Sequence, residues 1–329
     1  MGMNPAMVAG AIIAGGVFGD KLSPLSETNN LASAVVDVDL FAHIKHLLWS
    51  TAPAGVISVI LFAILGHSHG GATLGNIDKT VAVLQQNFSI TWWAAIPVIL
   101  VFVCAGFKMP AVPTMLLNVF VTSALIFVEQ PRIGLQKLTT IITDGYVAHT
   151  GNHTVDTLMS RGGIVSMMPT VALIVLTLSL GGFLVKLGLI EAVMTPLAKR
   201  LNSPGKLVLA GILTCLGVNI FVGEQFLSII LPGRAFKKAF NQGGLGNDAL
   251  GRVLEDGGTV INYLVPWGVG GVFLANTLGV PTMHYLPFVF FSLLCPVMSL
   301  ISGFTGIGLQ RQEKAAKKPH LTAVPEATH

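Results

Sequence analysis

The chain has 329 residues, of which 52% are hydrophobic and only 10% are charged. A soluble globular protein carries about 25% charged residues, so this composition excludes a water-soluble domain and indicates that lipid is the solvent. The net charge of +4 comes from basic residues in short polar stretches between apolar runs, which is typical of cytoplasmic loops and gives no basis for binding nucleic acid.

Apolar runs along the chain predict the membrane-spanning helices, each of which needs about 20 mostly apolar residues. The first run, residues 7–18, is rich in Gly and Ala and is typical of a close-packed helix. Residues 206–233 are too long for one straight span, and Glu224 interrupts them, so we predict a span, a break and a short second helix. The remaining segments that fit an ordinary span are 47–66, 92–107, 111–128, 164–187 and 284–309. We therefore expect an all-α polytopic membrane protein.

Two segments fit no ordinary span, because polar residues, Pro or Gly interrupt them. The first interrupted segment, residues 19–36, is polar yet lies between apolar runs. The second interrupted segment, residues 255–280, contains Pro266-Trp267-Gly268, where Pro lacks a backbone donor and Gly permits close approach. Irregular backbone at membrane depth is tolerated only where protein buries it or where it lines a cavity. Such a pair in the two halves of a chain points to inverted repeats with a binding site between them.

The first interrupted segment carries a dense set of oxygen donors. Short Ser, Thr and Asn side chains, with carbonyl groups freed by Pro24, are the ligands that a small hard cation such as sodium prefers. A carboxylate beside them can neutralise the cation or hold a proton in its place. A solvated surface loop is the alternative, but ionisable groups inside membrane segments are rare and usually functional. The candidate ion- and proton-binding residues here are Asp20, Ser23, Ser26, Glu27, Thr28, Asn29 and Asn30.

Acidic residues also interrupt the second half of the chain. Glu224, followed by Gln225, lies within an apolar run, where an acid is costly unless it is paired or faces water. We interpret it as a cation ligand or proton carrier, with an acid at the membrane interface as the alternative. Glu255 and Asp256 open the second interrupted segment, where a proton role and favourable placement at a helix N-terminus are equally supported. Asn262 lies opposite the Ser-Pro turn of the first segment when the two segments are overlaid.

Nothing in the sequence has the spacing of an enzyme site. There is no nucleophile–base arrangement, phosphate-binding loop or zinc-protease motif, so we expect no enzyme. His67 and His69 lack a third metal ligand, and the three cysteines lie in apolar runs without metal-ligand spacing. We expect no cofactor, and no metal beyond a transported sodium ion.

Several long motifs resemble those of the NhaC-type sodium/proton antiporters. They are FGDKLSPLSETNNLA (18–32), VDLFAHIKH (38–46), SRGGIVSMM (160–168), GEQFLSIILPGRAFKKAF (223–240) and LEDGGTVINYLVPWGVGGVFLANTLGVP (254–281). The resemblance covers nearly all of the chain up to its tail, although members of the family run longer at the N-terminus.

The resemblance implies an ion-transporter-superfamily fold of inverted repeats, each with a re-entrant hairpin and a broken helix. It places the first hairpin at residues 19–36 and adds Thr259 to the candidate site of the second half. The expected organisation is a membrane transport domain over residues 1–310, without the N-terminal spans of the family. A disordered cytoplasmic tail is expected over residues 311–329, which are rich in Lys, Ala and Pro.

The resemblance and the buried acids together predict exchange of sodium for protons by a multi-pass protein of the cytoplasmic membrane. In this hypothesis Asp20, Glu27 and Glu224 alternately hold a proton or help to bind sodium. The expected partners are these ions and lipid, with a homo-oligomer as one option. The nearest alternative is an exchanger of organic acids such as malate or lactate, but neither interrupted segment contains an Arg to bind a carboxylate. Tetracycline-like drug efflux on the same fold is a further alternative.

Overall fold

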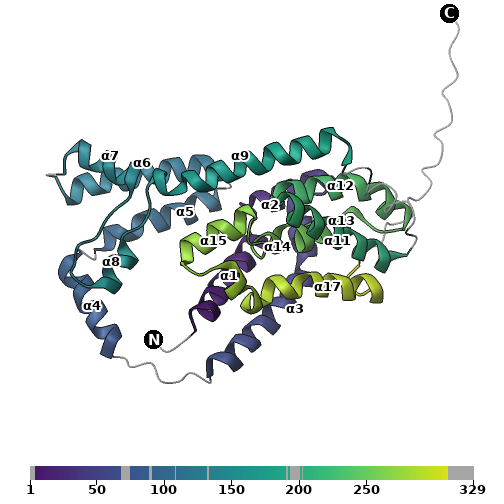
Figure 1. The fold of residues 1–329 in the computed structure, drawn as a ribbon, viewed down its shortest axis with the longest axis horizontal. Coiled ribbons are helices and arrows are strands. Elements are labelled where there is room, and N and C mark those ends of the chain that lie inside the picture. Colours follow the sequence, from purple (N-terminus) through teal and green to yellow (C-terminus); the bar gives the residue numbers. More distant parts are fainter. Residues whose placement is uncertain are drawn as a thin grey trace, which may run out of the picture.

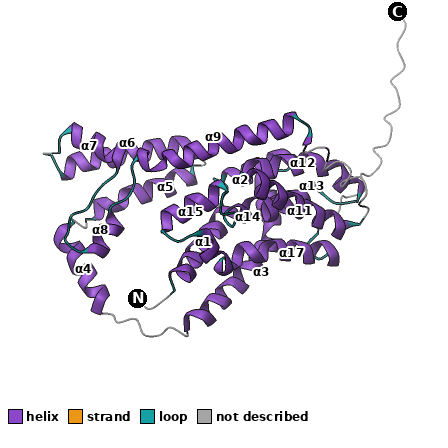
Figure 2. Cartoon of the chain, in the orientation of Figure 1, coloured by secondary structure: helices purple, strands orange, loops and turns teal. Residues whose placement is uncertain are grey.

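A computed structural model describes residues 4–67, 75–88, 91–107, 109–131, 133–189, 192, 201 and 203–309. These residues form helices and connecting loops, without a strand among them, which confirms the predicted all-α class (Figure 2). The predicted tail, residues 311–329, and His69 lie outside the described residues.

Four of the described helices are long and apolar enough to cross a membrane, and bent helix pairs raise that number to six. They include the predicted spans 47–66, 111–128 and 164–187, while 284–309 falls on a pair bent by 56°. The four are α3 (Leu40–His67), α6 (Ala111–Glu129), α9 (Ile164–Lys186) and α11 (Pro204–Val222).

The outer surface of these helices is apolar. Phe120 of α6 is 74% exposed, and Leu176 of α9 is 68% exposed. Large apolar side chains at this exposure are unfavourable in water and match a hydrocarbon surrounding. The polypeptide is therefore a multi-pass membrane protein.

The helices form a dense bundle and a looser peripheral group (Figure 1). The bundle contains α1, α2, α3 and the helices from α11 to α17, and α9 packs against both α7 of the periphery and α11 of the bundle. The peripheral helices are α4 (Gly75–Asn87), η1 (Trp92–Ala95), α5 (Ile96–Gly106), α6, α7 (Leu135–Asp144) and α8 (His153–Met159).

The first interrupted segment is the break between two half-helices, α1 (Pro5–Lys21) and α2 (Glu27–Val36). Both pack along the single long helix α3. Phe18 lies against Gly55, and Lys21 donates to Ser50, so α1 runs antiparallel to α3. Residues 19–36 therefore contain the end of α1, the break and α2, and the re-entrant hairpin expected there stays a prediction.

A helical hairpin occurs at α11 and α12 (Gln225–Gln242). Leu207 contacts Gly243 and Phe240 approaches Gly211, which shows that the two helices are antiparallel. The tip is Gly223, in the left-handed region at φ 78°, followed by the N-cap residue of α12. The predicted short second helix is wrong, since α12 has 18 residues and continues through the internal Pro232.

The second interrupted segment is also a broken helix. Its first part is a continuous helical run that contains a π-helical turn, and its second part begins at Val269 after the break at residues 263–268. The elements are α13 (Asn247–Leu254), η2 (Glu255–Thr259, the π-helix), α14 (Val260–Asn262) and α15 (Val269–Leu278). The chain then continues through α16 (Thr282–Tyr285) and η3 (Leu286–Phe288) into α17 (Phe290–Thr305). The predicted relation of the two halves by inverted repeats stays a prediction.

Candidate ion and proton site

A buried ion pair connects the two interrupted segments. Lys21, the last residue of α1, and Asp256 of the π-helix are both fully buried, and the Lys21 Nζ contacts Asp256 Oδ1. Ser299 of α17 donates to the other carboxylate oxygen, and Lys21 Nζ also donates to Ser50 Oγ at 3.3 Å. A buried pair is tolerated only when each charge is matched and hydrogen-bonded in this way.

Sequence reasoning missed Lys21 as a site residue. The available signal was a lysine at the end of an apolar helix, next to Asp20, where a charge is rare in a membrane segment. Its partner Asp256 was a candidate, but 235 residues separate the two, so the pairing had no local signature.

Glu255 lies beside this pair without a partner of its own. Its side chain is fully buried, and neither carboxylate oxygen has a hydrogen bond. The buried Thr259 hydroxyl, one helical turn further along, faces this carboxylate but makes no well-formed hydrogen bond. Because Lys21 and Asp256 neutralise each other, Glu255 brings an uncompensated negative charge unless a proton or a cation binds it.

The π-helix that carries both acids is held by close packing against the α11–α12 hairpin. A side chain at Gly258 would come within 3.0 Å of the Ser228 Oγ, so only glycine permits this approach. The carbonyl groups of Gly257 and Gly258 accept from Asn219 Nδ2 at 3.3 and 2.7 Å. A π-turn leaves such carbonyl groups poorly paired within the helix, and turns of this kind are frequent at functional sites.

Asn262 continues this amide network into the break of the second segment. Its Nδ2 donates to Asn219 Oδ1 at 2.9 Å, and its Oδ1 accepts from the Gly270 amide at 2.9 Å. The Val269 amide donates to the Gly223 carbonyl at 2.8 Å, which joins the break to the hairpin tip. Trp267 Nε1 donates to the Ile220 carbonyl at 2.7 Å. These bonds position the backbone.

The break of the first segment is closed by its own side chains. Asn29 Nδ2 lies 3.3, 3.0 and 2.9 Å from the carbonyl oxygens of Asp20, Lys21 and Ser23. These carbonyl groups belong to the last turn of α1 and to the turn that follows it. Ser26 Oγ donates to Asp20 Oδ2 at 3.1 Å and lies 3.0 Å from the Thr28 hydroxyl. The Asn29 Oδ1 is buried without a partner and remains available to a ligand.

The other predicted residues occupy more peripheral positions. Glu27 is exposed at the start of α2 and lines a pocket of about 450 Å³ together with Asn30. Asn30 donates to the Pro24 carbonyl at 3.0 Å. Glu224 is buried, and its carboxylate caps α12 by accepting from the Leu227 amide at 2.9 Å. The next residue, Gln225, has a buried Oε1 without a hydrogen-bond partner. The Ser23 hydroxyl accepts from the Leu25 amide.

The fold brings three of the predicted acids around one tyrosine. Asp20, Glu27 and Glu255 all lie within electrostatic range of the half-buried Tyr263. Their exposure falls along this series, from the exposed Glu27 through the partly exposed Asp20 to the buried Glu255. Among the described residues there is no cluster of three or more His, Cys, Asp or Glu side chains arranged to hold a metal ion.

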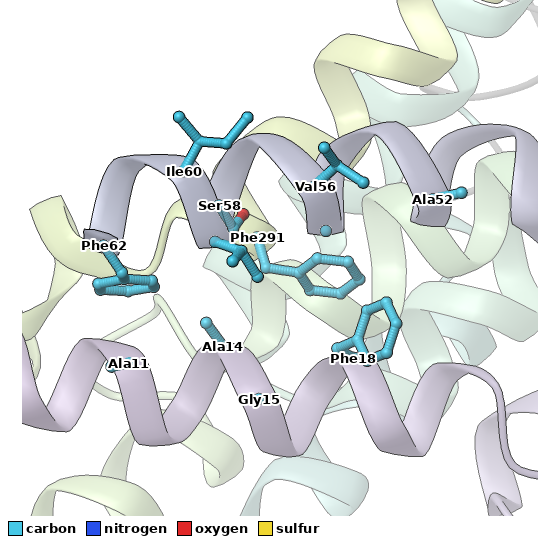
Figure 3. Close-up of a pocket in the computed structure, with 12 residues that line it drawn as sticks. Ala11, Ala14, Gly15, Phe18, Ala52, Val56, Ser58, Ile60, Phe62 and Phe291 are labelled. Atoms are coloured by element: carbon cyan, nitrogen blue, oxygen red, sulfur yellow. The ribbon is translucent and has the colours of Figure 1, made fainter. Parts of the chain in front are cut away.

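A larger groove between α1 and α3 has the wrong chemistry for an ion. It encloses about 560 Å³ and is lined almost entirely by apolar groups, with Phe18 and Phe291 facing one another (Figure 3). The Ser58 hydroxyl in this groove already donates to the Ala54 carbonyl at 2.6 Å. The lining of this groove therefore suits a hydrocarbon chain and not a sodium ion.

Comparison with known proteins places these features in a family. The model of the Na+/H+ antiporter family matches residues 15–307. The Na+/H+ antiporter NhaC of Alkalihalophilus pseudofirmus is 39% identical over 97% of this chain and 69% of its own length. NhaC of Bacillus subtilis is 38% identical over 90% of this chain and 66% of its own length. The malate-2H+/Na+-lactate antiporter of the same species is 34% identical over 93% of this chain and 66% of its own length. No solved structure gives a significant match.

The chain spans about two thirds of the length of these relatives. Their names are those of antiporters, which confirms the expectation of a transporter rather than an enzyme and supports sodium/proton antiport over the alternatives. The chain belongs to the Na+/H+ antiporter family.

Proposed function

We propose that this protein exchanges sodium for protons across the cytoplasmic membrane and that both ions compete for the carboxylate of Glu255. The observation that carries this proposal is the pair of buried, unpartnered Glu255 oxygens beside the neutralised Lys21–Asp256 pair. The family match and the NhaC relatives support the activity.

The physical basis of the exchange is that an isolated carboxylate is too costly to leave ionised in a dry interior. A bound proton and a bound sodium ion each neutralise Glu255, and one excludes the other. The Thr259 hydroxyl and the Asn29 carbonyl oxygen are buried and make no well-formed hydrogen bond, so they are the additional oxygen ligands that we assign to sodium.

The outer acids have separate proposed roles. Glu27 and Asp20 lead from the exposed surface towards Glu255, so we assign them to ion entry. Glu224 holds the tip of the α11–α12 hairpin through its cap, and we assign its carboxylate to ion binding only while that cap is open.

An organic-acid exchanger is less well supported. A carboxylate substrate needs a cation that is free to bind it. Within the described part of the site, Lys21 is paired with Asp256, and Arg252 donates to the Gly308 carbonyl and the Ser302 hydroxyl. The apolar outer faces of α6 and α9 fit lipid or a second copy of the chain, so a homo-oligomer stays an option.

The test is sodium-dependent collapse of a proton gradient in everted membrane vesicles. We expect Glu255→Gln to lower the rate at least about tenfold, because the amide keeps the shape but cannot exchange a proton. Glu129→Gln is the matched control, since Glu129 is exposed at the end of α6 and accepts from the Thr91 hydroxyl, away from the site. Wild-type rates in the Glu255→Gln variant, at equal protein content, would overturn the proposal.

A further inference from the structure

Two buried histidines near the start of α3 have no role in the site described above. The His43 side chain is fully buried, and neither of its ring nitrogens has a hydrogen-bond partner. His46 is 8% exposed, and its Nε2 is also unpartnered. Buried polar atoms without partners are rare in folded proteins and call for an explanation.

The two histidines lie on the face of α3 that leads to the buried ion pair. Residues 43, 46 and 50 recur at the three- to four-residue spacing of one helix face. Ser50 accepts from Lys21 Nζ at 3.3 Å, so this face ends at the Lys21–Asp256 pair. His43 is within electrostatic range of both members of the pair, and His46 is within range of His43.

His46, which lies between His43 and Ser50 on this face, reaches a polar surface pocket. His46 lines a pocket of about 410 Å³ together with Lys45, Trp49 and Asp248. The two imidazoles therefore stand between a water-accessible pocket and a buried carboxylate.

A glycine of α13 leaves the space that the His43 ring occupies. A side chain at Gly251 would come within 2.8 Å of His43 Cε1 and Nδ1, so only glycine leaves room for the ring. The charged groups that face the two histidines are Lys21 of α1, Asp256 of the π-helix, and Arg252 and Asp248 of α13, with Lys45 on α3 itself.

We propose that His46 and His43 carry protons between this pocket and the Lys21–Asp256 pair, an inference that rests on the proposed antiport. A proton binds one ring nitrogen of His46 while the other nitrogen releases one, and His43 repeats the step. Asp256 accepts the proton and passes it to Glu255. Each imidazole ends neutral as its other tautomer, and a flip of the ring restores the starting state, so the relay carries the next proton in either direction.

The test compares two modes of transport in proteoliposomes. Sodium/proton exchange needs the relay, whereas exchange of ²²Na⁺ for unlabelled sodium needs no proton transfer. We expect His46→Ala to lower sodium/proton exchange at least about tenfold while sodium/sodium exchange stays at the wild-type rate. Added imidazole enters the pocket of about 410 Å³ and restores proton exchange, more so at pH values where both of its forms are present.

His46→Gln and His43→Gln serve as variants of similar volume in case the alanine variant does not fold, and both are expected to show the same split. His153→Ala, in the exposed turn at the start of α8, is the control and keeps both modes. Wild-type proton exchange in the His46 and His43 variants, or equal loss of both modes without imidazole rescue, would overturn the relay. A wild-type protein that exchanges sodium for sodium but moves no protons would refute the proposed antiport itself.

Discussion

The two interrupted segments are closed in opposite ways. In the first, the amides of Asn29 and Asn30 satisfy carbonyl groups only 4 to 9 residues away. In the second, Asn219 and Trp267 make bonds that join residues 38 to 47 positions apart in the sequence. The first break is thus a local structure, whereas the second exists only when the α11–α12 hairpin is packed against it.

This difference indicates how the site is assembled. The first segment supplies a preformed turn that places Lys21 and Asp20 at the end of α1. The second supplies Asp256 and Glu255 from a π-helix that depends on its neighbours. The Lys21–Asp256 pair joins the two segments. The candidate site therefore lies where a locally closed break meets a break that is held by distant residues.

The largest expected effect comes from removing one charge of the Lys21–Asp256 pair. Lys21→Met leaves Asp256 buried without its cation, and we expect a loss of about 3–5 kcal/mol in the free energy of unfolding. The double variant Lys21→Met/Asp256→Met removes both charges and is expected to recover most of the loss. Thermal unfolding in detergent measures both. A double variant that is no more stable than the single one would contradict a buried pair.

Removing one amide from each break tests the contrast itself. Asn29→Ala and Asn219→Ala each leave buried carbonyl groups unpaired, so we expect each to cost about 1–3 kcal/mol. Hydrogen exchange should separate them. Asn29→Ala is expected to open only residues around the end of α1, whereas Asn219→Ala opens the hairpin tip and the π-helix together. Equal, local patterns in both variants would show that the second break is also self-sufficient.

The smallest expected effect concerns a local closure outside the membrane. Asp156 of α8 accepts from the amide of Thr150, in the loop before this helix, at 2.6 Å and from the Thr150 hydroxyl at 2.7 Å. These bonds hold the pKa of the Asp156 carboxyl below its ordinary value of 3.8. Their stabilisation is therefore complete above that value and is lost as the pH falls through the lowered pKa of the folded state.

Exchange protection of residues around Thr150 should decline only in this acidic range in the wild type. In Asp156→Asn the protection should be weaker already at neutral pH and should no longer depend on pH there. A decline that begins well above pH 3.8 would show that the Asp156 carboxyl is not the group responsible.

Residue types predicted the fold class and the regions that carry the site, but they could not assign the partners. The polar run from Asp20 to Asn30 was recognised as a site because its donors are adjacent in the sequence. Glu255 and Asp256 were equally compatible with helix-terminal acids, because nothing local distinguishes a paired acid from an unpaired one. The hairpin at residues 19–36 was expected from the family resemblance, since a Pro-broken polar segment by itself looks the same whether the chain turns back or continues along a neighbour.

What the sequence by itself determined was the membrane as solvent, the helical class and the two breaks, since hydropathy, Pro and Gly act over a few residues. The tertiary structure decided that Lys21 meets Asp256, that Glu255 is left without a partner, and that His43 lies within electrostatic range of this pair. Those outcomes depend on which buried surfaces meet. The cost of burying an ionisable group depends on whether distant helices supply it with a partner, and the sequence does not show which helices meet.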